Sequence, residues 1–387
     1  MRSKMSSKER ILAAVKHQEI DYVPVAPRIW AWFLEYYGKC GWQTYLRAAE
    51  EFDFDPVFDI GPGLPSYIGW PEINDGCAKL KNVKFEKSVR RDKEFKIVRR
   101  RFITPAGELT DEMRVPPAGG DFGIAPNPEN TEWLLKTEED LEKIKCLLPD
   151  PALGDYRAMF RTIDEIKGRA LAAARPTVGS DGMLLLAMGV ENAMINYMAN
   201  RKFITSAFDI FHEYNHAVAK KCLEAGANVI FDSGYNMSLS TGWSPEAWRE
   251  LFYPKVKAMC DLAHSFNALY FYYDDGKMMK ILPYLAEIGA DIVETCTPPP
   301  VGDFVLKEAK EKWGKRLCFK GYIETVHVMR LGTPAKIREA VAETIRLGAP
   351  GGGFILGTSD SIRDGTPLEN IKAYFSAARE FGKITQS

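Results

Sequence analysis

Short apolar segments alternate with helical segments along most of this chain, and this alternation limits the fold more than any other feature of the sequence. Val229 to Phe231, Leu269 to Tyr273 and Ile292 to Thr295 are examples of the apolar segments. Runs of this length suit strands that are buried on both faces, and short links join them to the helices. The pattern is typical of βα units with a parallel sheet, so we predict an α/β fold.

The clearest of these units lies near the C-terminus. Gly353 to Asp360 reads as a strand that ends in a loop, and a helix follows from Thr366. Thr366 is predicted to cap that helix, with Pro367 in its first turn. In (β/α)8 barrels the loops at the carboxyl ends of the strands hold the active site, so Thr358 to Asp364 should face one. The predicted architecture is therefore a (β/α)8 TIM barrel.

Residues 79–114 depart from this pattern. Val83 to Val89 and Phe95 to Val98 alternate polar and apolar residues with the period of two that exposed strands show, and Pro105 to Gly107 suits a turn. We therefore predict an antiparallel β insertion into the barrel. A chain of 387 residues could hold two average domains, but barrels with insertions reach this length. We predict a single domain over residues 1–387.

The composition excludes several classes of function. Lys and Arg together number 51, Asp and Glu number 52, and the net charge is −1. This balance gives no electrostatic basis for binding nucleic acid or a membrane surface. Seven cysteines without a C-x-x-C pair indicate reduced thiols in the cytoplasm, and no apolar segment is long enough to span a bilayer. We expect a cytoplasmic protein with a small-molecule substrate, and a homodimer stays open.

Polar residues follow several of the predicted strands. In a barrel these positions converge at one end, so residues far apart in the sequence can line one pocket. The alternative for each residue is a helix cap, and it has equal weight for Asp181, Asp275 and Asp360. The polar positions after strands are Asp59, Ser180, Asp181, Asp232, Ser233, Asp274, Asp275, Glu294, Cys296, Glu324, His327, Thr358 and Asp360.

Aromatic residues are concentrated after the first predicted strand, Tyr22 to Ala26. Aromatic side chains provide flat apolar walls for an aromatic ligand, although ordinary packing must account for most of them. Trp30, Tyr235 and Tyr273 directly follow predicted strands and are the better candidates for such walls. The glycine-rich stretch Gly348 to Gly353 precedes a strand and lacks the lysine of a P-loop, so we interpret it as a tight link between a helix and a strand.

Several segments together resemble the uroporphyrinogen decarboxylase-like superfamily. This superfamily contains the decarboxylase and also methyltransferases that exchange methyl groups with corrinoid proteins. The resemblance covers most of the chain and implies the barrel fold, with Asp59 at the family's early acidic position. The segments that carry it, in chain order, are Lys8 to Ala14, Asp21 to Val25, Phe58 to Ile60, Ile230 to Ser233, Gly321 to Glu324 and Gly353 to Ile371.

The residues that define the family's two best-known activities are replaced in this chain. Thr358 stands where the decarboxylase has a histidine, and Arg28 alone represents its arginines near the first strand. Thiol-directed methyltransferases bind zinc through a His-x-Cys pair and a cysteine after the last strand. Tyr273 and Asp275 take the place of that pair, and Thr358 replaces the last cysteine. The resemblance therefore implies a relative without the thiol-activating ligands.

These substitutions favour an aromatic methyl ether as the methyl donor. The resemblance implies that a separate partner protein carries the corrinoid (cobalamin) whose Co(I) accepts the methyl group. Tyr273 or Asp275 would assist the departing phenolate, and Asp59 is the third expected catalytic residue. The residues expected to bind the substrate are Arg28, Trp30, Asp181, Ser233, Tyr235, Thr358 and Asp360.

Zinc is a further candidate cofactor. Glu294, Cys296 and His327 combine a carboxylate, a thiol and an imidazole near two adjacent predicted strand ends, and zinc prefers such ligands. Two other functions stay open. One is a decarboxylase for a tetrapyrrole or a smaller acid, with Asp59 stabilising a cationic intermediate, and the other is a non-catalytic barrel that binds a corrinoid or a tetrapyrrole. The chain has no Asp-x-His-x-x-Gly motif, so another protein would have to deliver a corrinoid.

Overall fold

A computed structural model describes residues 5–66, 68–69 and 80–384 of the chain. The chain divides into two compact units, and each is described by itself. The first unit combines Met1–Ile60, Arg157–Arg175 and Leu223–Ser387, and the second combines Gly61–Tyr156 and Pro176–Cys222.

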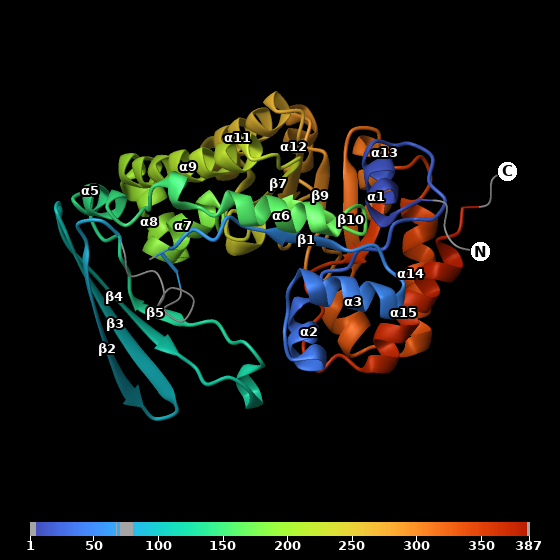
Figure 1. The fold of residues 1–387 in the computed structure, drawn as a ribbon, viewed down its shortest axis with the longest axis horizontal. Coiled ribbons are helices and arrows are strands. Elements are labelled where there is room, and N and C mark those ends of the chain that lie inside the picture. Colours follow the sequence, from blue (N-terminus) through green and yellow to red (C-terminus); the bar gives the residue numbers. More distant parts are fainter. Residues whose placement is uncertain (1–4, 67, 70–79, 385–387) are drawn as a thin grey trace. The chain divides into compact units, whose positions relative to one another are not determined.

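A seven-stranded sheet forms the centre of the first unit (Figure 1). All neighbouring strands in it are parallel, and their order in the sheet follows their order in the chain. The predicted α/β fold with a parallel sheet is therefore confirmed. The strands are β1 (Val57–Ile60), β6 (Leu171–Ala174), β7 (Val229–Ser233), β8 (Leu269–Tyr273), β9 (Ile292–Thr295), β10 (Cys318–Ile323) and β11 (Phe354–Thr358).

Helices connect these strands, as parallel neighbours require. None of the helices in the described part of the chain is long and apolar enough to cross a membrane. The helical elements of the first unit are α1 (Ser7–Val15), α2 (Trp30–Tyr37), α3 (Trp42–Phe52), α6 (Tyr156–Ile166), η3 (Leu239–Thr241), α10 (Pro245–Ala247), η4 (Trp248–Phe252), α11 (Tyr253–Ser265), α12 (Leu282–Ile288), α13 (Leu306–Trp313), η5 (Thr325–Arg330), α14 (Pro334–Gly348) and α15 (Leu368–Phe381).

The predicted first strand, Tyr22 to Ala26, pairs with the sheet at one residue. Val25 forms a single parallel bridge with Leu356 of β11. Its carbonyl oxygen also accepts the N–H of Asp55, two residues before β1, at 2.7 Å. Pro24 has no N–H to donate, which limits the pairing of this segment. The segment therefore contacts both the last strand and the residues that lead into the first.

One face of the parallel sheet carries a buried apolar cluster. Because side chains alternate between the two faces of a strand, residues two positions further along point to the same side. Further along each strand, the side chains that point to this same face lie at the carboxyl end of the strand, beyond the cluster. The strand residues of the cluster are Leu171, Ala173, Val229, Phe231, Phe271, Tyr273, Ile292, Cys318 and Ile355.

The start of the C-terminal helix differs from the prediction. α15 begins at Leu368, with Pro367 as the N-cap residue. The hydroxyl of Thr366 donates to the carbonyl oxygen of Arg363 at 2.7 Å, so it does not accept from the helix. The prediction that Thr366 caps the helix is therefore wrong, because its side chain is used within the preceding turn.

The second unit contains a separate four-stranded antiparallel sheet in the order β2, β3, β4, β5. Its presence confirms the antiparallel insertion predicted at residues 79–114. The sheet extends further, to Glu132, and residue 79 lies outside the described residues. The elements of this unit are β2 (Lys84–Asp92), β3 (Phe95–Thr104), β4 (Gly107–Val115), η1 (Gly120–Phe122), β5 (Glu129–Glu132), α5 (Asp140–Lys145), η2 (Pro151–Leu153), α7 (Ser180–Met188), α8 (Val190–Ala199) and most of α9 (Arg201–Glu224).

Candidate active site

Charged and aromatic side chains lie at the carboxyl ends of the parallel strands. Strand register places Ser233 beside Tyr273, Tyr273 beside Glu294, and Glu294 beside Lys320. Asp59 occupies the corresponding place in β1, two residues after Val57, which packs against the apolar cluster. Each of these positions lies on the face that carries the cluster. The topology therefore brings them to one end of the sheet.

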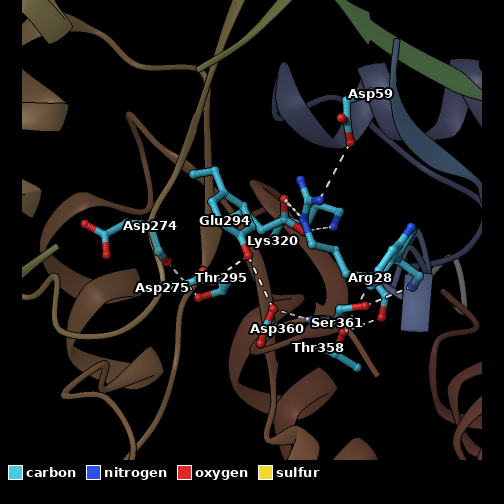
Figure 2. Close-up of polar contacts among 12 residues, drawn as sticks. Arg28, Asp59, Asp274, Asp275, Glu294, Thr295, Lys320, Thr358, Asp360 and Ser361 are labelled. Carbon is cyan, nitrogen blue, oxygen red and sulfur yellow. Dashed lines mark hydrogen bonds and ion pairs between the residues drawn. The ribbon is translucent and has the colours of Figure 1, made fainter. Parts of the chain in front are cut away.

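Glu294 is buried at the centre of a charge network at this end of the sheet (Figure 2). The network consists of Arg28, Asp59, Arg175, Glu294 and Lys320. Its two carboxylate oxygens accept from Lys320 Nζ and, at 3.0 Å, from Arg28 Nε. Burial lowers the pKa of Lys320, and the negative charge of Glu294 acts in the opposite direction. Removing either cation would leave the buried carboxylate of Glu294 with one partner fewer, which is costly in an apolar interior.

Asp59 joins two guanidinium groups. Its Oδ2 lies 3.2 Å from Arg175 Nη1, and its Oδ1 lies 3.7 Å from Arg28 Nη1. Burial on its own would raise the pKa of Asp59, but Arg175 and then Arg28 hold that pKa below its ordinary value. Asp59 is therefore a carboxylate at neutral pH, with solvent access to about a quarter of its side chain (26% exposed).

The guanidinium of Arg28 lies against two aromatic rings. Its Cζ is 4.3 Å from the centre of the Tyr273 ring and 4.7 Å from that of Phe231. Its backbone is held by Thr358, whose hydroxyl oxygen lies 3.2 Å from the Arg28 nitrogen and 3.3 Å from its carbonyl oxygen. Thr358, predicted to bind substrate, is buried and engaged in these contacts. Thr358 therefore positions Arg28.

Tyr273 links two carboxyl groups. Its hydroxyl is 2.5 Å from Asp275 Oδ1 and 3.4 Å from Asp360 Oδ1. Burial, followed by the negative charge of Asp360, raises the pKa of Asp275 to about 7. Burial also raises the pKa of Tyr273 well above its ordinary value. At neutral pH Asp275 can therefore exist in both protonation states, which is the property of an effective general acid or base.

The other predicted substrate-binding residues take different places around this group. The ring of Tyr235 lies 4.8 Å from that of Tyr273. Ser233 is buried, and its hydroxyl has no hydrogen-bond partner among the described residues. Trp30 is 45% exposed and contributes a backbone N–H, which donates to Ser361 Oγ at 2.9 Å. Tyr235 and Ser233 thus belong to the site, whereas the indole of Trp30 faces solvent to a large extent.

Two other polar residues from the predicted set lie at the starts of helical elements. Asp181 belongs to the second unit, where it is buried in the first turn of α7. Glu324 caps η5, and its carboxylate accepts the N–H groups of Val326 at 2.9 Å, of His327, and of Val328 at 3.2 Å. Glu324 therefore follows the helix-cap alternative that was open for each of these polar positions, because its oxygens satisfy the first N–H groups of a helix.

The predicted zinc ligands are not brought together. Glu294 is engaged by two basic side chains. Cys296 donates its Sγ hydrogen to the carbonyl oxygen of Val293 at 3.4 Å, and burial raises the pKa of its thiol. His327 is exposed on η5. In the part of the chain that the structure covers, no three His, Cys, Asp or Glu side chains are grouped as metal ligands. These residues do not fit a zinc site.

Sequence reasoning misses two members of the charge network, Arg175 and Lys320. Lys320 falls inside a predicted strand, and Arg175 directly follows β6. Each lies two residues after a member of the apolar cluster, Ala173 in one case and Cys318 in the other. The period of two along a strand is therefore the signal that could have identified both.

Comparison with known proteins relates the chain to one family and two activities. The family profile described as "Uroporphyrinogen decarboxylase (URO-D)" matches residues 128–381. A methylated-thiol–coenzyme M methyltransferase of Methanosarcina mazei is 23% identical, over 98% of this chain and 91% of that protein. A uroporphyrinogen decarboxylase of Trichodesmium erythraeum is 23% identical, over 65% of this chain and 70% of that protein. A solved methyltransferase from Methanosarcina mazei covers 98% of this chain and 99% of its own, with a TM-score of 0.67 and 18% identity, a likeness of fold.

Proposed function

Because the chain belongs to the uroporphyrinogen decarboxylase (URO-D) family, we propose that it transfers a methyl group from an aromatic methyl ether to a corrinoid held by a separate protein. The observation that carries the proposal is the pair of Tyr273 and Asp275. The pair stands where thiol-directed relatives have a zinc-binding His-x-Cys pair, and it provides a carboxyl group whose pKa is raised to about 7. An acid at this position suits a leaving group that needs a proton.

The comparisons support methyl transfer as the reaction class. The relative that matches nearly the whole chain is named as a methyltransferase that uses a methylated thiol. A reduced corrinoid would supply the nucleophile that takes the methyl group. The predicted zinc ligands are not grouped in the part of the chain described, so the steps assigned to this chain depend on its acids, cations and aromatic side chains.

The chemical step requires the ether C–O bond to break while the methyl group passes to the nucleophile. The bonding electrons stay on oxygen as a phenolate. Protonated Asp275 gives its proton to that oxygen, which leaves an Asp275 carboxylate and a neutral phenol. The buried Tyr273 hydroxyl holds Asp275 in place at 2.5 Å. Asp275 is the better acid of the two, because the pKa of Tyr273 is raised well above its ordinary value.

The acid role can be tested with a series of methyl ethers whose phenols differ in acidity. Asp275→Asn should slow demethylation most for the ethers of weakly acidic phenols, because good leaving groups need less help. Asp261→Asn, which alters an exposed carboxylate paired with Lys257, serves as the control. An equal loss of rate across the series would exclude Asp275 as the proton donor.

We further propose that the parallel sheet closes into a single (β/α)8 barrel. The segment around Val25 contacts both β11, through Leu356, and the residue Asp55 ahead of β1. These contacts support closure between the two ends of the sheet. An experimental structure in which Val25 pairs with only one of these neighbours would contradict the closed barrel.

A decarboxylase that acts on a small acid is the second candidate. It is favoured by Arg175, which joins Arg28 beside Asp59 and supplies a second guanidinium for a substrate carboxylate. Asp59 would then stabilise positive charge in the reaction. The two candidates differ in their products, since decarboxylation releases carbon dioxide and leaves an ether intact.

A further inference from the structure

Helix α9 of the second unit carries a short motif that the candidate active site does not use. Residues 212–216 read His-Glu-Tyr-Asn-His and match H-E-x-x-H, in which two histidines bind one metal ion. The motif requires a helix, and the whole stretch lies inside α9, Arg201–Glu224 (Figure 1). Because the two histidines are four positions apart, their imidazoles lie on the same face of that helix.

The two imidazole rings are close enough to share a metal ion. The centres of the His212 and His216 rings are 5.8 Å apart, and the ring planes are inclined at 56° to each other. Zinc binds imidazole nitrogen at about 2.0–2.1 Å, so two imidazoles on one tetrahedral zinc ion have ring centres roughly 5 Å apart. A small rotation of one side chain covers the difference, and the helix itself does not have to move.

The His216 ring has hydrogen-bonding capacity that the protein leaves unused. The ring is half-buried and contacts His212, but its nitrogens make no hydrogen bond to any residue that the structure describes. Burial, and then the positive charge of Lys220, lower the pKa of His216, so the ring is neutral at neutral pH. Neutral imidazole is the form that binds metal ions. His212 has to offer only one ring nitrogen, and the other can keep a hydrogen bond.

The surroundings restrict the movement of the His212 ring. His212 is 9% exposed, and Phe208 and Asn215, on the same side of α9, are each 1% exposed. Asn215 Oδ1 accepts a hydrogen bond from Thr177 Oγ1 at 2.6 Å, which ties this side of the helix to the segment before α7. A ring that is already packed loses little further side-chain entropy when it binds an ion.

We propose that His212 and His216 bind a divalent transition-metal ion of the kind that prefers imidazole, such as Zn²⁺. Glu213 is exposed, and no third protein ligand is grouped with the two histidines in the described part of the chain. Two imidazoles therefore hold the ion, and water or another small ligand completes its coordination. Both histidines belong to the second unit, and neither is part of the candidate active site. The site requires neither the corrinoid nor the proposed reaction.

Calorimetric titration of the metal-free protein with zinc chloride tests this site. One zinc ion should bind through the two rings, and His212→Gln and His216→Gln should each weaken its binding by roughly tenfold or more. Changes to residues that merely support metal ligands already cost about 10–100-fold in affinity. His264→Gln is the matched control, because His264 also lies on a helix but pairs with Asp291 at 2.9 Å. Zinc affinity that is the same in wild type and in both test variants would overturn the proposal.

A second measurement uses the wild-type protein alone and therefore does not depend on whether the variants fold. Cu²⁺ binds imidazole more tightly than Zn²⁺ does. The electron paramagnetic resonance spectrum of the protein with one equivalent of Cu²⁺ should show coupling to the nitrogens of two imidazoles. A copper spectrum without nitrogen coupling would contradict the site. Circular dichroism would identify a variant that fails to fold, whose zinc affinity is then set aside in favour of the copper spectrum.

Discussion

Lys320→Met should destabilise the protein far more than the loss of an ordinary lysine. Lys320 is 2% exposed, and its Nζ is bonded to Glu294, which is 0% exposed. Methionine fills a similar volume but carries no charge, so the variant leaves a buried carboxylate with one partner fewer. That partner is Arg28, whose Nε stays 3.0 Å from the other oxygen.

The expected loss follows from these contacts. Breaking a buried ion pair by removing one partner costs about 3–5 kcal/mol. Arg28 continues to compensate Glu294, so the lower end, about 3 kcal/mol of unfolding free energy, is expected. Glu294→Gln combined with Lys320→Met should cost less than the sum of the two single changes, because the pair is then removed together.

Urea denaturation followed by circular dichroism measures this loss. Lys257→Met is the control, because Lys257 forms an ion pair with Asp261 on the surface, where both side chains are about half exposed. Exposed pairs contribute little to stability, so this variant should unfold close to the wild-type midpoint. A Lys320→Met midpoint equal to that of Lys257→Met would refute the view that the buried network stabilises the unit.

Three further results are expected. Demethylation should slow as the pH rises through about 7, because the acid Asp275 then loses its proton, and the pH–rate profile of Asp275→Asn should lack this decline. If the Asp59 carboxylate stabilises charge in the reaction, Asp59→Asn should lower kcat by roughly 10²-fold or more, with little change in the thermal midpoint of unfolding. Unchanged kinetics in the folded variant would remove Asp59 from the mechanism. Thr358→Val should raise KM and lower unfolding free energy by about 1–2 kcal/mol, because it releases the backbone of Arg28, and an unchanged KM would contradict this positioning role.

The order of strands and helices could be predicted largely from the sequence. β8 and β9 have the bounds that their apolar runs indicate, Leu269–Tyr273 and Ile292–Thr295. Buried parallel strands are mostly apolar on both faces, and β8 accordingly ends directly before the polar residue Asp274, whereas β9 itself contains the polar residues Glu294 and Thr295. The Tyr22 to Ala26 segment carries the same kind of signal but pairs only at Val25, because Pro24 lacks a donor. Its apolar character alone does not reveal how far the pairing extends.

The site could be predicted only in part. Asp59, Tyr273 and Asp275 lie at strand ends, where the barrel rule places functional groups. Lys320 lies inside an apolar strand, and Arg175 directly follows one, so neither stands out in the sequence as a site residue. Their importance comes from Glu294 and Asp59, which lie on other strands and reach them through long-range contacts. Glu324 shows why sequence alone leaves two readings open, since a polar residue after a strand can line a pocket or cap the following helix, and here it caps η5.

The most direct test of the proposed reaction is the analysis of products from the protein, a reduced corrinoid protein and 4-methoxybenzoate. The proposal predicts one 4-hydroxybenzoate for each methyl group found on the corrinoid, with a slower reaction for Asp275→Asn at pH 7. Release of carbon dioxide with an intact methyl ether would favour the decarboxylase instead. Absence of any phenol across a panel of aromatic methyl ethers, with a corrinoid partner proven to be active, would contradict the transfer of a methyl group from aromatic ethers.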